Sequence, residues 1–242
     1  MTDRAAEIAA NLAEVRARIE AACAAAGRDP AGVRLLGVSK TFPAEDAIAL
    51  ADLGVLDLAE NREQDAGPKA ARVAELRPDL PIRWHMVGQL QRNKARAVVR
   101  WAAEVQSVDS ARLAAALARA VGNATAAGER EGPLDVLLQA SIDGDPARGG
   151  CPLDDLPALA EEVVGARDLR LRGIMAVAPR GVEPAAAFAR LASAAERLRA
   201  EHPQATELSC GMSNDLEEAI DYGSTCVRVG TALLGGRGLA SP

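Results

Sequence analysis

Eight short segments rich in Val, Ile and Leu recur along the chain, and longer stretches with helical periodicity lie between them. The β-prone segments span residues 33–38, 55–58, 82–87, 105–108, 134–139, 171–177, 207–210 and 226–229. The helix-like stretches include residues 44–53, 110–121, 153–164 and 184–200, which are rich in Ala, Leu, Glu and Arg. This alternation predicts parallel strands joined by crossover helices. Eight units favour a closed (β/α)8 TIM-type barrel of the α/β class, with an open, doubly wound sheet as the alternative.

An additional helix is expected before the first strand. Its apolar residues recur every three or four positions, at Ile8, Leu12, Val15 and Ile19. Gly27 ends this pattern, as glycine often does at the end of a helix. The 242 residues match the size of a minimal barrel, and no linker rich in Pro, Gly or Ser divides them. We therefore expect one domain over residues 1–242.

The composition argues against several classes of partner. The net charge of −6 is spread along the chain without a basic block, so we expect neither nucleic acid nor a membrane as a partner. Four well-separated cysteines and only two histidines make a zinc site or a disulfide framework unexpected. The sequence has no leader-like N-terminus and no apolar stretch long enough to span a membrane. We expect a cytoplasmic monomer.

The first expected strand ends at a lysine. Barrels of this type carry their chemistry at the C-terminal ends of the strands. Residues 33–38 run directly into Ser39 and Lys40, which places the Lys40 amine over the barrel mouth with apolar neighbours beneath it. Partial desolvation would lower the pKa of such an amine and let it attack an aldehyde. The alternative is a solvated surface charge, the commoner state of lysine.

Two later junctions have the character of an anion site. The backbone amides of residues 209–214, between a strand and a helix, can converge on a phosphate, although Glu217 also fits ordinary helix capping. The last strand ends in Gly230 and Thr231, and phosphate sites in these barrels often use the loops after strands seven and eight. Arg228 either reaches into the mouth or forms an exposed salt bridge at the rim. A lysine, a phosphate site and a cation together suit pyridoxal phosphate, which has an aldehyde, a phosphate and a pyridine nitrogen.

Several motifs strengthen this interpretation. The most specific is WHMVGQLQRNK at residues 84–94. The others are LGVSKT at 36–41, EN at 60–61, RGIMA at 172–176, GMS at 211–213 and VRVGT at 227–231. In this order, over nearly the whole chain, they resemble the pyridoxal phosphate homeostasis proteins, also called proline synthase co-transcribed homologues. The fold of that family is like the N-terminal barrel of alanine racemase.

The resemblance implies a role for each matching residue. Lys40 would carry pyridoxal 5′-phosphate as a Schiff base, and Arg228 would face the pyridine nitrogen. The matches to phosphate contacts are Ser213, Gly230 and Thr231. The matches to other positions that line the cofactor are Asn61, Met175, Ser209 and Met212. Two departures, Leu58-Ala59 in place of Phe-Gly and Arg62 in place of an aromatic residue, alter the expected pocket near Asn61.

His85 and the basic residues after it are interpreted as structural. A lone imidazole at a strand end favours a role in ordering Asn61 or a loop through hydrogen bonds over a role in acid–base catalysis. The basic residues Arg92, Lys94 and Arg96 are interpreted as a solvated helix start. The alternative for them is a patch that binds a second phosphorylated ligand.

The resemblance implies a protein that holds pyridoxal phosphate, limits free aldehyde and supplies apo forms of pyridoxal phosphate enzymes, without strong catalytic activity. An arginine keeps its proton, so Arg228 would leave the pyridine nitrogen neutral and weaken the ring as an electron sink. A racemase needs acid–base groups on both faces of its substrate, and the sole tyrosine, Tyr222, lies late in an expected helix. The alternatives are a weak amino-acid racemase, another Schiff-base enzyme of this barrel type, or a regulatory protein that only retains the fold.

Overall fold

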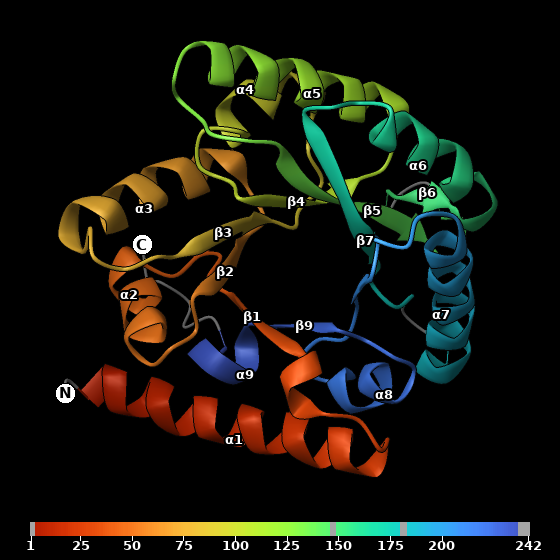
Figure 1. Cartoon of the computed structure of the whole chain (residues 1–242). Coiled ribbons are helices and arrows are strands. Elements are labelled where there is room, and N and C mark those ends of the chain that lie inside the picture. The colour runs from red at the N-terminus through yellow and green to blue at the C-terminus, as the bar shows by residue number, and fades with distance from the viewer. Residues whose placement is uncertain (1–2, 146–148, 180–182, 237–242) are drawn as a thin grey trace.

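The computed structural model describes residues 3–145, 149–179 and 183–236. Helices surround a central set of strands (Figure 1). The helices are α1 (Asp3–Ala25), α2 (Ala44–Asp52), α3 (Glu63–Leu76), α4 (Ala95–Val98), α5 (Ala111–Ala126), α6 (Leu156–Val164), α7 (Pro184–Glu201), α8 (Leu216–Asp221) and α9 (Thr231–Leu234). No described helix is long and apolar enough to cross a membrane.

The strands form a closed parallel barrel, as the alternation in the sequence predicts. They are β1 (Arg34–Val38), β2 (Asp57–Glu60), β3 (Arg83–Met86), β4 (Glu104–Val108), β5 (Leu134–Ser141), β6 (Cys151–Pro152), β7 (Leu169–Met175), β8 (Glu207–Ser209) and β9 (Cys226–Val229). The order around the barrel is β1-β2-β3-β4-β5-β7-β8-β9, and β9 pairs with β1 to close it. The two-residue strand β6 pairs only with the end of β5, outside the barrel. The closed eight-stranded barrel is confirmed, and the open sheet is not formed.

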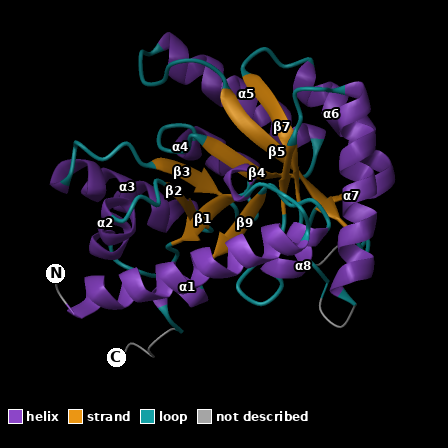
Figure 2. Cartoon of the chain, turned by 60° about the horizontal axis from the view of Figure 1, so that its bottom comes forward, coloured by secondary structure: helices purple, strands orange, loops and turns teal. Residues whose placement is uncertain are grey.

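The predicted N-terminal helix is also confirmed. The buried residues of α1 are Ile8, Leu12, Val15, Ile19 and Cys23, the apolar face that the spacing predicts. Gly27 follows the helix with a φ of +64°, where a side chain would be strained, and the amide of Arg28 closes the end on the carbonyl of Cys23 at 2.8 Å. The helix packs on α8, α9 and α2, and Figure 2 shows it running alongside α8. This helix therefore covers the side of the barrel on which β9 pairs with β1.

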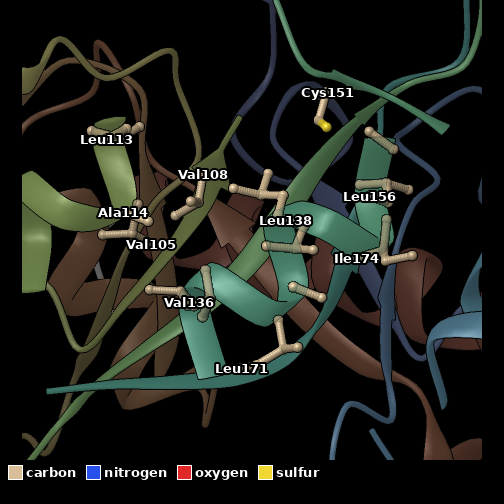
Figure 3. Close-up of a cluster of buried hydrophobic side chains, with 14 of the residues drawn as sticks. Val105, Val108, Leu113, Ala114, Val136, Leu138, Cys151, Leu156, Leu171 and Ile174 are labelled. Atoms are coloured by element: carbon tan, nitrogen blue, oxygen red, sulfur yellow. The ribbon is translucent and has the colours of Figure 1, made fainter. Parts of the chain in front are cut away.

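The largest apolar core lies between the strands and the outer helices. Figure 3 shows part of it, a cluster that includes Val136 and Leu138 of β5, Ile174 of β7, Leu113 of α5 and Leu156 of α6. These five side chains are at most 2% exposed. Removing this apolar surface from water stabilises the fold by about 25 cal/mol for each Å² buried. The barrel can therefore keep polar residues in its interior without losing its main source of stability.

The interior of the barrel is charged at its N-terminal end. The Arg34 guanidinium of β1 contacts Asp57 of β2 at 3.1 Å, Glu104 of β4 at 3.3 Å and Glu207 of β8 at 2.5 Å. Neither β4 nor β8 neighbours β1, so the last two contacts cross the interior. Above this layer lies a small apolar cluster that includes Leu36. The mouth at the C-terminal ends of the strands is therefore separated from the opposite end by packed side chains.

Candidate functional site

The expected site residues gather where β1, β7, β8 and β9 end. Arg228 of β9 pairs in register with Leu36 of β1, two residues before Val38 and four before Lys40. Met175 of β7 pairs with Ser209 of β8, which pairs with Cys226 at the start of β9. These neighbouring strands bring the lysine, the arginine and the two loops of the expected anion site to one rim of the barrel.

Lys40 is exposed and makes no hydrogen bond or ion pair with the described residues. The partial desolvation expected from the sequence is therefore wrong for this side chain, because it extends from the turn after β1 into solvent. The other two lysines are engaged: Lys69 pairs with Glu60 at 2.6 Å and Lys94 with Glu63 at 3.2 Å. Lys94 thus takes part in an ion pair at the start of a helical turn. Of the three lysines, all of which the structure describes, Lys40 alone has no hydrogen bond or ion pair with a described residue.

A buried ion pair fixes the backbone from which Lys40 projects. The Lys69 ammonium donates hydrogen bonds to Glu60 at 2.6 Å and to the carbonyl of Ser39 at 2.8 Å. The Ser39 hydroxyl donates to the same Glu60 oxygen at 2.8 Å. These bonds tie the end of β1 to the end of β2, where Lys40 and Asn61 follow. Lys69 was missed in the sequence because its helical position gives no sign that it points back to the strands.

Asn61 is half-buried at the end of β2 and lies against the backbone of Gly88. A Cβ atom at Gly88 would collide with the Asn61 carbonyl, so this close approach requires glycine. Gly88 belongs to the motif at residues 84–94, which explains part of its specificity. Asn61 thus has a fixed backbone beside the Lys40 turn.

Arg228 is buried, with 5% of its surface exposed. One terminal nitrogen donates to the carbonyl and hydroxyl of Ser209 at 2.7 and 2.8 Å, and the other to the carbonyl of Ala176 at 2.7 Å. None of these partners is a carboxylate, so the alternative of an exposed salt bridge at the rim is wrong. Burial lowers the pKa of the guanidinium from its ordinary value. The site therefore holds a buried cationic group whose partners are all neutral.

The two expected phosphate loops contact each other. The amide of Ala232 donates to the Ser213 hydroxyl at 3.3 Å, and Thr231 is exposed at the start of α9. Gly230 packs so closely on Val38 that an added Cβ atom would lie 3.1 Å from the Val38 carbonyl oxygen. These loops therefore lie directly beside the end of β1, which leads to Lys40.

Some polar groups of the first loop, residues 209–214, form hydrogen bonds within the protein. The Asp215 carboxylate accepts a hydrogen bond from the amide of Met212 at 2.6 Å, and Asp215 is the residue that precedes α8. Glu217 pairs with Arg18 of α1 at 2.6 Å, and its carboxylate also accepts a hydrogen bond from the backbone in the first turn of α8. Arg18 also donates to the carbonyl of Ser213 at 2.9 Å, which anchors this loop to α1. The amide of Met212 is therefore not free for an anion.

The remaining expected residues differ in exposure. Met175 and Ser209 are almost completely buried, at 1% and 0%, whereas Met212 is 37% exposed on the loop after β8. A ligand at the mouth could touch Met212 directly. The Ser209 hydroxyl accepts a hydrogen bond from Arg228 at 2.8 Å.

His85 does not contact Asn61, in contrast to one of the roles expected from the sequence. Its imidazole lies between Asp57 at 2.7 Å and Glu104 at 2.9 Å, inside the barrel. Burial opposes the charge of the ring, but the hydrogen bonds to Asp57 and Glu104 outweigh it and raise the pKa of His85. The reason for the difference is the direction of alternation along β3, which turns His85 into the charged layer.

The chain matches known proteins over nearly its whole length. The family model described as "Alanine racemase, N-terminal domain" matches residues 4–238. An alanine racemase from Corynebacterium glutamicum shares the fold with a TM-score of 0.67 at 14% identity, over 98% of this chain and 62% of that chain. The molecule is therefore a barrel of the alanine racemase N-terminal class.

Sequence relatives narrow this class. A pyridoxal phosphate homeostasis protein of Mycobacterium leprae is 47% identical, over 99% of this chain and 96% of the relative. PipY of Synechococcus elongatus, solved with pyridoxal phosphate bound, is 34% identical with a TM-score of 0.80, over 94% of this chain and 100% of that chain. The chain belongs to the pyridoxal phosphate homeostasis protein family.

Proposed function

We propose that this chain binds pyridoxal phosphate at the barrel mouth, holds it as a Schiff base on Lys40 and serves intracellular pyridoxal phosphate homeostasis without strong catalytic activity. The observation that carries the proposal is that two cationic side chains, Lys40 and Arg228, lie at the same rim of the barrel. Lys40 is the one lysine without a partner among the described residues, and Arg228 is a buried cation without a carboxylate. In a family with a member solved with pyridoxal phosphate bound, these groups suit the aldehyde and the ring nitrogen of that molecule.

The residues around these groups fit the rest of the cofactor. Ser213, Gly230 and Thr231 lie beside the end of β1 and offer hydroxyl and amide donors to a phosphate. Asn61 and Met212 border the mouth, whereas Met175 and Ser209 support it from below. Bound in this way, the cofactor would have its phosphate towards α9 and its ring nitrogen towards Arg228.

Arg228 decides which chemistry the site supports. Bound pyridoxal phosphate supplies an aldehyde carbon for an amine and an aromatic ring that withdraws electrons. The guanidinium donates hydrogen bonds and does not take up a further proton, so a ring nitrogen that faced it would remain neutral. A neutral ring stabilises negative charge at a substrate Cα poorly. The exposed position of Lys40 leaves room for the amine of a recipient enzyme to approach the same carbon, which suits storage and transfer.

The alternative is a weak amino-acid racemase, which the shared fold with alanine racemases favours. A two-base mechanism needs a second acid–base group at the mouth. Tyr222 directly follows α8 and precedes β9, so it lies at the N-terminal end of the strands, opposite to Lys40. We therefore place homeostasis ahead of racemisation.

The test is a titration of cofactor-free protein with pyridoxal phosphate, followed by visible absorbance. Wild-type protein and Lys94→Ala should develop the absorption of a Schiff base at one equivalent, and Lys40→Ala should not. A panel of amino acids should then show no racemisation by the loaded protein. Equal absorption changes in wild-type protein and Lys40→Ala would refute the assignment of the lysine, and rapid racemisation would favour the alternative.

A further inference from the structure

A line of side chains inside the barrel connects Arg228 to a buried carboxylate. Arg228 donates to the Ser209 hydroxyl at 2.8 Å, and that hydroxyl donates to the Gln106 carbonyl oxygen at 2.7 Å. The Gln106 amide nitrogen donates to Glu104 at 2.7 Å. All four side chains are at most 5% exposed. The line therefore runs through the buried interior of the barrel, from the mouth on β9 through β8 to β4.

The two ends of the line determine the direction of every hydrogen bond in it. An arginine only donates hydrogen bonds, and an ionised carboxylate only accepts them. The Ser209 hydroxyl must therefore accept from Arg228 and donate to Gln106, and the amide of Gln106 must turn its nitrogen to Glu104. Hydrogen bonds aligned in one direction polarise and strengthen one another. The guanidinium, which also donates to the backbone carbonyls of Ser209 and Ala176, is thus oriented in part from Glu104, at the far end of the line.

Glu104 is held in its ionised form. Burial opposes its charge, but the hydrogen bond from His85, the charges of His85 and Arg34 and the hydrogen bond from Gln106 outweigh this effect and lower its pKa to about 2. A carboxylate in direct contact with Arg228 would satisfy the guanidinium and compete with a ligand for it. Glu104 acts on Arg228 through two neutral side chains, Gln106 and Ser209. It therefore leaves the other N–H groups of Arg228 available to a ligand.

We infer that Gln106 and Ser209 are positioning residues that align Arg228, through the charge of Glu104, for a hydrogen bond to the ring nitrogen of the ligand. The inference rests on the proposed function, because it assigns the ring nitrogen as the partner of Arg228. The two residues do not touch the ligand. Their effect is confined to how well the site distinguishes a ring with a nitrogen at this position from one without it.

The experiment compares two ligands, pyridoxal phosphate and its 1-deaza analogue, in which a C–H group replaces the ring nitrogen. Wild-type protein should bind the analogue about tenfold more weakly, because a buried donor then loses its partner. Ser209→Ala and Gln106→Leu should reduce this preference to about threefold or less, since a misaligned guanidinium gains little from the nitrogen. Ser209→Thr keeps the hydroxyl and should keep the preference.

Ser107→Ala is the matched control. Ser107 is a buried serine on the same strand as Gln106, at 1% exposure, and its hydroxyl has no hydrogen-bond partner among the described residues. This variant should retain the wild-type preference. A purely structural role for Ser209 and Gln106 would weaken both ligands equally and leave their ratio unchanged, which would overturn the inference while the proposed function stands. A wild-type protein that binds pyridoxal phosphate without any preference would overturn the contact between Arg228 and the ring nitrogen itself, and the positioning role with it.

Discussion

At the scale of single residues, the site depends on which partners each charged group has. Lys69 and Lys94 are neutralised by acids, whereas Lys40 is free and Arg228 is bonded only to neutral oxygens. A buried cation without an acid is costly unless hydrogen bonds replace its solvation. For Arg228, the hydrogen bonds to Ser209 and Ala176 replace that solvation, and no carboxylate among the described residues competes with the ligand that we propose.

Arg228→Glu tests the consequence for chemistry. A glutamate beside the ring nitrogen would hold a proton there and strengthen the ring as an electron sink. We expect the wild type to show negligible exchange of the Cα proton of alanine in deuterated water. Per bound cofactor, Arg228→Glu should exchange at least about tenfold faster, which corresponds to ~1.4 kcal/mol of barrier. NMR of the Cα proton measures both rates, and fast exchange by the wild type would reveal a second base.

At the scale of elements, the two loops after β8 and β9 form one surface. The hydrogen bond from Ala232 to Ser213 joins them, and Arg18 of α1 supports the first loop from outside. The N-terminal helix therefore contributes to the shape of the mouth as well as to the core. This contribution was not foreseen, because contacts between residues 195 positions apart leave no local signal in the sequence.

Removing both hydroxyls of this surface should weaken phosphate binding selectively. Ser213→Ala combined with Thr231→Ala should reduce affinity for pyridoxal phosphate much more than for pyridoxal, because each charge-assisted hydrogen bond contributes about 1.5–3 kcal/mol. Equilibrium titration with both ligands measures the difference. Ser193→Ala, at an exposed serine of α7, serves as the control. An equal loss for both ligands would place the phosphate elsewhere.

The comparison of sequence and structure shows which elements local patterns can identify. The barrel follows from alternation, because the outward faces of the strands are apolar. The second strand was placed at 55–58 but spans Asp57–Glu60, because its inward residue Asp57 is charged and the apolar run precedes the strand. Lys40 and Arg228 could be identified from the sequence because both lie in motifs at the ends of strands. Gln106 was missed because its partner Ser209 is 103 residues away.

At the scale of the whole molecule, the charged layer holds non-neighbouring strands together. The imidazole of His85 on β3 joins Asp57 and Glu104, and Arg34 joins Glu104 and Glu207. The proximity of Glu104 helps to raise the pKa of Glu207, after the effect of burial, and Arg34 opposes this. The layer therefore couples global stability to the protonation of His85.

The free energy of unfolding should fall as the pH rises from about 6.5, the ordinary pKa of histidine, through the raised pKa of folded His85. Below that range His85 is protonated in both the folded and the unfolded state, and its full contribution to the free energy of unfolding is present. In the range itself the folded state binds more protons, so raising the pH removes about 1.4 kcal/mol for each unit by which the folded pKa exceeds the unfolded one. Urea unfolding across pH measures this slope. His85→Gln should lose it and His202→Gln should keep it; a slope unchanged in His85→Gln would contradict the assignment.

The most direct test of the account is the location of the covalent bond to pyridoxal phosphate. Protein loaded with the cofactor is reduced with borohydride, digested and analysed by mass spectrometry. Because the sequence contains three lysines, the possible positions are well separated: Lys40, Lys69 and Lys94. The account predicts the pyridoxyl phosphate mass on the peptide with Lys40 alone, since Lys69 and Lys94 are engaged in ion pairs among the described residues. The same mass on Lys69 or Lys94, with Lys40 unmodified, would contradict it.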